Sequence, residues 1–300
     1  MASVTQQTIA TGNALGHVTR PARALIGWMQ QTEAQLMLAQ RMVQMAGNQS
    51  HVDRASMARQ TVAARPPLVE ELHILSEPGP ELAGHIATLV AQPDYQPFVT
   101  EGWSVKIADL RKVVALQPMV FWDHARERTQ SAVAGDMPAL ARLTLPIRSG
   151  PEPLPLQFDP ARNTWMITSR NPNLRIVGQF SGPVDVGGGH QVTGCGFIVT
   201  ISASFVQVIR YRDRLLLRDG YHRTLGLLSQ GITHVPVLFR EFGQFEPLGL
   251  GPGMLPEASY LGVRPPFLAD YLADAVSAEI DLPASQKMLV IQGIEMNPMG

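Results

Sequence analysis

Apolar residues recur along this chain with two spacings, and each spacing predicts a different element. The helical spacing, with an apolar residue at every third or fourth position, predicts helices over residues 22–46, 81–91, 122–133, 138–143 and 265–280. The first of these helices has a methionine-rich face, and Gly47-Asn48 is its expected end. Pro265-Pro266 opens the last helix, because proline is favoured in a first helical turn.

Alternating and β-branched runs predict strands. These runs lie at residues 103–108, 154–158, 164–169, 174–180, 197–210, 214–218, 235–239 and 288–291. The glycine-rich run 187–196 is expected to be a mobile connector, with a substrate lid as the alternative. From 197 to 239 the predicted order is strand, turn, strand, glycine-bearing turn, short helix and strand.

This order of elements predicts the α+β class, with a helical N-terminal region in front of the strands. We expect three parts: a mainly helical region over 1–100, a mixed domain over 101–245, and a linker with a helix and a strand over 246–300. A chain of 300 residues is long enough to bury a sizeable core.

Composition and charge narrow the classes of protein that remain. Hydrophobic residues make up 45% and charged residues 16%, which excludes a highly charged disordered chain. The net charge of −1 argues against a protein that binds nucleic acid with its whole surface. Cys195 is the one cysteine, so no disulfide forms within the chain. No apolar run predicts a membrane span and the first residues do not resemble a signal peptide, so a cytoplasmic location is the default expectation.

The glycine-bearing turn at 219–224 carries the most specific chemistry. Gly220 lets the backbone bend and lets a ligand approach closely. The amides of Tyr221, His222 and Arg223 then stand at the start of a helix, where free N–H groups and the helix dipole favour an anion. Arg223 adds a guanidinium that holds phosphate with parallel hydrogen bonds. These residues predict an anion site, most simply one for a nucleotide phosphate.

Local charge agrees with an anion site, although structural interpretations stay open. Between residues 210 and 240 six arginines stand against two aspartates. In the structural interpretation, His222 hydrogen-bonds a core carbonyl and Asp219 caps the helix. His124 and Glu127 are spaced for one helix face, and in the absence of a third ligand we expect a solvated surface and no metal site.

The stretch from Leu215 to Val237, LLLRDGYHRTLGLLSQGITHVPV, resembles the core signature of the ParB/sulfiredoxin superfamily. That signature is a hydrophobic strand, a glycine turn ending in His-Arg or Arg-Arg, a short helix, a glycine and a Val-Pro-Val strand. The close match covers about 25 residues, and it extends to the range 101–245 if the domain begins near Trp103. The resemblance implies a mixed sheet with short helices in a bacterial protein.

The resemblance also implies a function. Family members hold nucleotide phosphates at this turn: ATP in sulfiredoxins and free-serine kinases, CTP in ParB proteins. It therefore implies ATP or CTP with Mg²⁺ as the ligand, and an NTP hydrolase or phosphotransferase as the activity. The implied phosphate-binding residues are Gly220, Tyr221, His222, Arg223 and Thr224, and the implied catalytic residues are Asp219 and Arg223.

This sequence departs from the family pattern at one important position. Tyr221 stands where sulfiredoxins have their catalytic cysteine, which argues against sulfinic acid reduction. Tyr221 and the two residues after it, His222 and Arg223, stand where ParB clamp proteins have Glu-Arg-Arg. This difference argues against CTP hydrolysis of that type.

Two other function classes remain as alternatives. A nuclease or DNA-associated protein would use the same arginines against a phosphodiester backbone, with binding that weakens steeply as salt rises. A non-catalytic interaction protein would keep the fold as a scaffold. Its docking surfaces would be the methionine-rich helix over 22–46, which would bind a protein partner or a second copy, and the apolar helix over 267–280.

Overall fold

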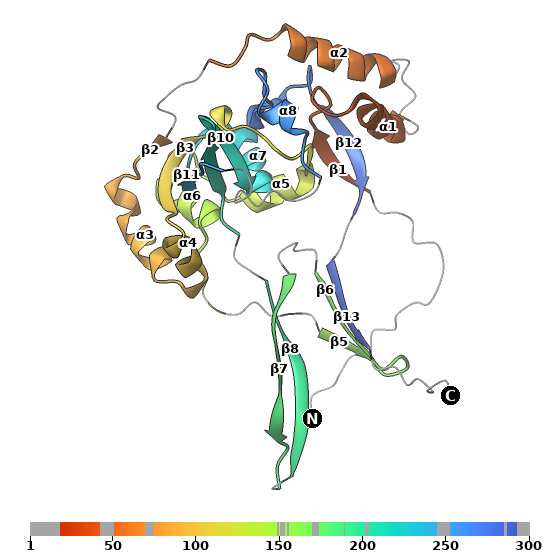
Figure 1. The fold of residues 1–300 in the computed structure, drawn as a ribbon, viewed down its shortest axis with the longest axis vertical. Coiled ribbons are helices and arrows are strands. Elements are labelled where there is room, and N and C mark those ends of the chain that lie inside the picture. The colour runs from red at the N-terminus through yellow and green to blue at the C-terminus, as the bar shows by residue number, and fades with distance from the viewer. Residues whose placement is uncertain are drawn as a thin grey trace.

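A computed structural model gives the fold (Figure 1). The residues it describes are 19–42, 51–69, 75–148, 150, 154, 156–169, 174–188, 190–201, 204–244, 253–284 and 287–292. Within these ranges no helix is long and apolar enough to cross a membrane. The predicted helix end at Gly47-Asn48 lies outside them.

The centre of the molecule is a five-stranded sheet in the order β10-β9-β11-β3-β2. Its strands are β2 (Leu75–Ser76), β3 (Ser104–Asp109), β9 (Gln207–Tyr211), β10 (Arg214–Asp219) and β11 (His234–Glu241). β11 runs parallel to β9, whereas the other neighbours are antiparallel. The sheet is therefore mixed, and together with the helices it confirms the α+β class.

Residues 207–241 confirm the predicted order of turn, strand, glycine-bearing turn, short helix and strand. Arg212 and Asp213 have φ of 47° and 58°, the conformation of a tight hairpin turn, and they join β9 to β10. Leu215, Leu216 and Leu217 are buried although β10 is an edge strand of the sheet, and Val114 pairs with Leu216 on its outer side. Gly220 then leads into helix α7 (Tyr221–Ser229), which is followed by β11.

A second sheet, β12-β1-β4, corrects two helix predictions. β1 (Thr19–Ala24) pairs on one side with β12 (Ala278–Pro283) and on the other with β4 (Met119–Phe121), so residues 22–24 are strand and helix α1 begins only at Gln31. The predicted helix 265–280 is a 3₁₀ turn followed by β12. Pairing on both sides of β1 buries Ala22 and Ala24 completely, and this long-range pairing outweighs local helix propensity.

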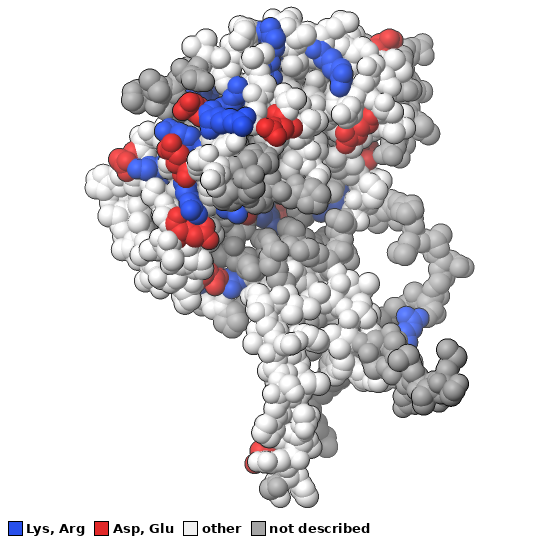
Figure 2. Space-filling model, viewed as in Figure 1, with Lys and Arg blue, Asp and Glu red and all other residues white. Residues whose placement is uncertain are grey.

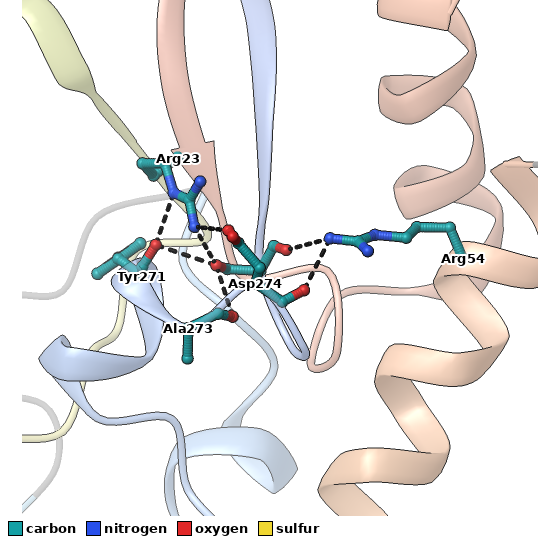
Figure 3. Close-up of polar contacts among 6 residues, drawn as sticks. Arg23, Arg54, Tyr271, Ala273 and Asp274 are labelled. Carbon is teal, nitrogen blue, oxygen red and sulfur yellow. Dashed lines mark hydrogen bonds and ion pairs between the residues drawn. The ribbon is translucent and has the colours of Figure 1, made fainter. Parts of the chain in front are cut away.

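Arginine side chains join this second sheet and helix α2 (His51–Ala64) to residues 271–277, which lead from the 3₁₀ turn into β12 (Figure 3). Arg23 donates to the carbonyl oxygen of Tyr271 at 2.7 Å, to the carboxylate of Asp274 at 2.7 Å and to the hydroxyl of Ser277 at 2.8 Å. Arg54 donates to the carbonyl oxygens of Asp274 at 2.7 Å and Ser277 at 3.2 Å. Segments far apart in sequence are therefore joined by hydrogen bonds from two arginine side chains to backbone carbonyls and to side-chain oxygens.

The helices are short, as expected. The α-helices are α1 (Gln31–Met42), α2 (His51–Ala64), α3 (Ala83–Val90), α4 (Gln96–Thr100), α5 (Trp122–Thr129), α6 (Met137–Thr144), α7 (Tyr221–Ser229) and α8 (Glu257–Tyr260). The 3₁₀ turns are η1 (Pro80–Leu82), η2 (Pro93–Tyr95), η3 (Leu110–Lys112) and η5 (Leu268–Leu272). The helix predictions over 81–91, 122–133 and 138–143 are confirmed by α3, α5 and α6. α5 packs against α7, and α6 packs against β11.

Strands below the body in Figure 1 form an arm. One part is the three-stranded sheet of β5 (Leu156–Asp159), β6 (Thr164–Ser169) and β13 (Lys287–Gln292). The other is the ribbon of β7 (Leu174–Asp185) and β8 (Gln191–Ile201). The prediction of a mobile connector over 187–196 is wrong for residues 191–196, because they pair with β7 along its length. The predicted strand 197–210 is divided between β8 and β9.

The hydrophobic core draws on all three predicted ranges. Trp28 from the first range, Leu217 from the second and Tyr271 from the third belong to one cluster of buried residues. Packing between distant segments therefore positions the turn at 219–224 as much as the central sheet does.

Candidate functional site

The glycine turn lies between β10 and α7, where Gly220 has φ of +101°. L residues rarely adopt this left-handed conformation. A Cβ on Gly220 would also lie 2.7 Å from Cγ2 and 3.0 Å from Cα of Val206. Glycine is required here both by the backbone conformation and by the close approach of Val206, so the bend predicted from the sequence has a structural cause.

Asp219 uses its carboxylate within the turn. One carboxylate oxygen accepts the Gly220 N–H at 2.6 Å, and the other accepts the Ser204 hydroxyl at 3.2 Å. The first contact satisfies the N–H of Gly220, which is itself the N-cap of α7, and no side chain caps the helix, so the alternative in which Asp219 is the cap is wrong. The predicted catalytic role of Asp219 stays a prediction.

Arg223 points into the protein and is 6% exposed. Its Nη1 donates to the carbonyl oxygens of Ser204 at 2.6 Å and Leu143 at 3.0 Å, and its Nη2 donates to the Ser204 hydroxyl at 2.8 Å. Burial lowers the pKa of Arg223 to about 10, and the negative charge of Asp219 offsets part of that shift. A phosphate would have to displace these bonds, so the guanidinium serves to join α6, residue 204 and α7.

Tyr221 and Thr224 are also committed to internal contacts. The Tyr221 hydroxyl accepts the Leu116 N–H at 2.8 Å and donates to the Leu217 carbonyl at 2.6 Å. Burial raises the pKa of this hydroxyl. Thr224 is fully buried and donates to the Tyr221 carbonyl at 3.1 Å. The side chains of both residues stabilise the start of α7, and their phosphate-binding role stays a prediction.

The Nε2 atom of His222 is buried and has no hydrogen-bond partner within the described residues, and the same holds for Nε of Arg223. The ring stacks parallel to that of Phe121, with centroids 6.4 Å apart, and lies edge-on to that of His124 at 5.4 Å. Burial is the largest cause that lowers the pKa of His222 to about 3, and basic neighbours lower it further: Arg128, His124, Arg20 and Arg223. The imidazole is therefore neutral at pH 7 in a positive environment.

The first-turn amides of α7 are the remaining predicted donors. The Gly220 N–H is taken by Asp219, whereas the N–H groups of Tyr221, His222 and Arg223 have no acceptor among the described residues. Unpaired N–H groups in a first helical turn carry partial positive charge. The first turn of α7 thus has three unpaired amides, whereas the Arg223 guanidinium is bound to residues 143 and 204.

Sequence analysis named His124 only with Glu127, and it placed none of His124, Arg128 and Arg20 near His222. His124 and Arg128 lie on α5 and Arg20 lies on β1, where its Nε donates to the Asp123 carboxylate at 2.7 Å. The four-residue spacing of His124 and Arg128 was the available signal, because it places both on one helix face. No local signal could have placed Arg20, since its position follows from the pairing of β1 with β4.

Other polar clusters and cavities add little to the site. Among the described residues no group of three His, Cys, Asp or Glu side chains is arranged to hold a metal ion. A cavity of about 630 Å³ lies at the far end of α7 and is lined by Asp123, Arg126, Glu127 and Gln230 among others. A second cavity, of about 570 Å³, lies in the arm between the ribbon and the β13-β6-β5 sheet.

Comparisons with known proteins add no support to the resemblance beyond the residues that carry it. No protein-family model matches the chain, and searches of the curated proteins and of the solved structures found no match. The resemblance to the ParB/sulfiredoxin superfamily therefore rests on residues 215–237 alone.

Proposed function

We propose that this chain is a ParB/sulfiredoxin-like protein that binds the phosphate of a nucleotide at the first turn of α7. The observation that carries the proposal is the set of unpaired amides of Tyr221, His222 and Arg223, together with the unpartnered Nε2 of His222. Backbone N–H groups in a first helical turn are common ligands of phosphate. The succession of strand, glycine turn, helix and strand in residues 214–241 supports the same family.

Charge around His222 supports an anion as the ligand. Arg20 and Arg128 both lower the pKa of this imidazole, so they act together as local positive charge, whereas burial lowers the pKa of His124 itself and leaves it mainly neutral at pH 7. Arg20 is partly neutralised by Asp123. A bound phosphate would compensate the remaining positive charge and would accept hydrogen bonds from the first-turn amides.

The proposal gives Arg223 and Asp219 positioning roles. Arg223 is held by Ser204 and Leu143, and Asp219 is held by Gly220 and Ser204. These contacts fix the direction in which the amides point. The proposed activity is binding, and hydrolysis or phosphate transfer by Asp219 is no part of it.

The test is calorimetric titration of the full chain with ATP, CTP, GTP and inorganic phosphate. We expect at least one nucleotide to bind, and His222→Ala to weaken that binding about tenfold, the value of one charge-assisted hydrogen bond. His234→Ala is the matched control, because His234 is exposed on β11, and it should bind like wild type. Wild-type protein that binds none of these ligands would contradict the proposal, and so would equal binding by both variants.

A second measurement separates loss of binding from loss of fold. In wild-type protein, the backbone amide resonances of Tyr221, His222 and Arg223 should shift when the ligand is added, whereas that of His234 should not. Binding that leaves all three first-turn resonances unmoved would place the ligand elsewhere.

A non-catalytic interaction protein is the second candidate, and a different observation favours it. The side chains of Asp219, Tyr221 and Arg223 are all engaged in the protein's own hydrogen bonds, as expected for a fold kept as a scaffold. This candidate predicts no nucleotide binding in the titration above, together with stable assembly of the chain.

A further inference from the structure

The arm contains two layers, the ribbon and the β13-β6-β5 sheet, which pack together at one end. On β8 the alternate residues Ile201, Val199 and Phe197 lie on one face of the ribbon, and Leu174 shares this face because it pairs with Ile201. Ile167 of β6 forms a buried cluster with Leu174 and Ile201, and Val199 packs against it. This face of the ribbon therefore covers the sheet where β7 begins and β8 ends.

Aromatic residues continue the sheet's side of this contact. Trp165 lies two residues before Ile167 in β6, so both are on one face of the sheet. Ile291 and Phe158 share that face, because they pair with Trp165 from either side. The rings of Phe158 and Trp165 have centroids 4.5 Å apart. An apolar row of three residues thus lies beside the buried cluster, on the face that the ribbon covers.

A cavity of about 570 Å³ separates the two layers at this row, and we name it the arm cavity. The residues that line it are Trp165 and Ile291 of the sheet and Gln179, Phe180, Ser181, Cys195, Gly196 and Phe197 of the ribbon. The exposed fractions are 44% for Trp165, 45% for Phe197 and 40% for Ile291. Small-molecule sites have volumes of about 300–1,000 Å³. A molecule of that class bound here would extend the apolar core that the buried cluster begins.

The lining of the arm cavity favours an uncharged ligand. None of the described residues that line it is Asp, Glu, Lys, Arg or His, and the arm in Figure 2 is nearly white beside the charged body. A charged ligand would lose its hydration there without gaining an ion pair, which is costly. Gln179 and Ser181 bring an amide and a hydroxyl that can hydrogen-bond an uncharged polar group. A nucleotide phosphate therefore does not suit this cavity.

Aromatic side chains favour a ligand that contains a ring. Trp165 of the sheet and Phe197 of the ribbon line opposite sides of the cavity. Aromatic rings in offset or edge-on contact stabilise each other beyond the burial of their surface. Phe158 packs against the Trp165 ring, so a ligand loses less free energy in ordering that ring.

We propose that the arm cavity binds an uncharged aromatic molecule between Trp165 and Phe197, and that Gln179 and Ser181 hydrogen-bond its polar group. The proposal goes beyond the nucleotide site at α7 and shares no residue with it. Cys195 pairs with Ser181 and lies on the same face of the ribbon as Phe197, so its thiol provides a marker for occupancy of the cavity.

Two fluorescent probes test the preference for an uncharged ligand on the full chain. Phenylnaphthylamine is uncharged and aromatic, and anilinonaphthalene sulfonate carries the same rings with an added negative charge. Both gain fluorescence in apolar surroundings. We expect phenylnaphthylamine to bind, and the sulfonate to bind at least about tenfold more weakly, since no lining residue compensates its charge.

Phe197→Ala and Ile198→Ala are a matched pair of variants. These neighbours in β8 are both about half exposed, and they lie on opposite faces of the ribbon. We expect Phe197→Ala to weaken the binding of phenylnaphthylamine at least about tenfold, because an aromatic wall is lost. Ile198→Ala should bind like wild type. Thermal unfolding at the wild-type temperature establishes that each variant is folded.

Alkylation of Cys195 by iodoacetamide locates the bound probe and needs no variant. Cys195 is the one cysteine of the chain, and it is exposed. Saturation with phenylnaphthylamine should slow its alkylation, because the probe covers the cavity that the thiol lines. This measurement tests the proposal even if Phe197→Ala does not fold.

Several outcomes overturn the proposal. Wild-type protein that does not bind phenylnaphthylamine overturns it, and equal binding of the two probes would mean that the site does not select an uncharged ligand. Binding that leaves the alkylation of Cys195 unchanged, or that survives in folded Phe197→Ala, would place the probe on other exposed apolar residues. None of these outcomes bears on nucleotide binding at α7, which the calorimetric titration measures separately.

Discussion

Arg223 donates to the carbonyl oxygen of Ser204 at 2.6 Å and to the hydroxyl of the same residue at 2.8 Å. The sequence predicts that Arg223 binds phosphate, whereas in the structure its guanidinium binds the protein's own backbone. Its burial excludes water from the contact, which makes both groups costly to leave unpaired.

Arg223→Ala should therefore lower the free energy of unfolding by about 3 kcal/mol, since it leaves the buried carbonyls of Ser204 and Leu143 unsatisfied. Urea unfolding followed by circular dichroism measures the loss. Ser204→Ala removes the two hydrogen bonds of the hydroxyl, with Arg223 and with Asp219, but keeps the carbonyl contact, and it should cost about 1–2 kcal/mol. An Arg223→Ala protein as stable as wild type would mean that the guanidinium is free for a ligand.

Gly220→Ala should destabilise the protein more than Gly231→Ala does. Both glycines have positive φ, of 101° and 76°, so both substitutions incur about 1–2 kcal/mol of backbone strain. At Gly220 the new Cβ also overlaps Val206, which adds about 1–3 kcal/mol, whereas nothing lies within 4 Å of a Cβ at Gly231. Thermal unfolding of the two variants measures the difference, and equal losses would show that Val206 can move aside at no cost.

The free energy of unfolding should fall as the pH drops from 7 to 5, and His222 should account for part of the fall. The pKa of His222 is about 3 in the folded chain against about 6.5 when unfolded, so between these values the unfolded chain binds a proton that the folded chain does not. His222 contributes a slope of up to about 1.4 kcal/mol per pH unit in that window. His222→Gln removes this contribution, and unfolding curves of both proteins should converge towards pH 5. Parallel pH profiles would contradict the burial of a neutral imidazole.

Arg23→Ala should cost much more than Asp274→Ala, although the two side chains form an ion pair. Arg23 also donates to the Tyr271 carbonyl and the Ser277 hydroxyl, so its loss should cost about 3 kcal/mol. The Asp274 side chain is 78% exposed, and losing it should cost less than about 1 kcal/mol. Chemical unfolding of both variants tests this order, and a reversed order would assign the stability to the carboxylate.

Much of the central sheet is predictable from the sequence, because its signals are local. β9, β10, α7 and β11 follow from short hydrophobic runs interrupted by turn residues, and Gly220 marks the bend that its own φ requires. The strand nature of residues 191–196 was missed for an equally physical reason. Their glycines have little strand propensity, and they pair with β7 because Phe180 and Val184 lie across them.

The sequence alone determined the order of elements over 207–241, the near-neutral charge and the residues offered at the first turn of α7. Tertiary structure decided what those residues do. The positions of residues 143 and 204 in the fold decide whether Arg223 faces a ligand or Ser204. The pairing of residues 22–24 with β12 decides whether they form a helix or a strand. Such contacts join segments far apart in the chain, so their free energy is absent from any local pattern of hydrophobic and polar residues.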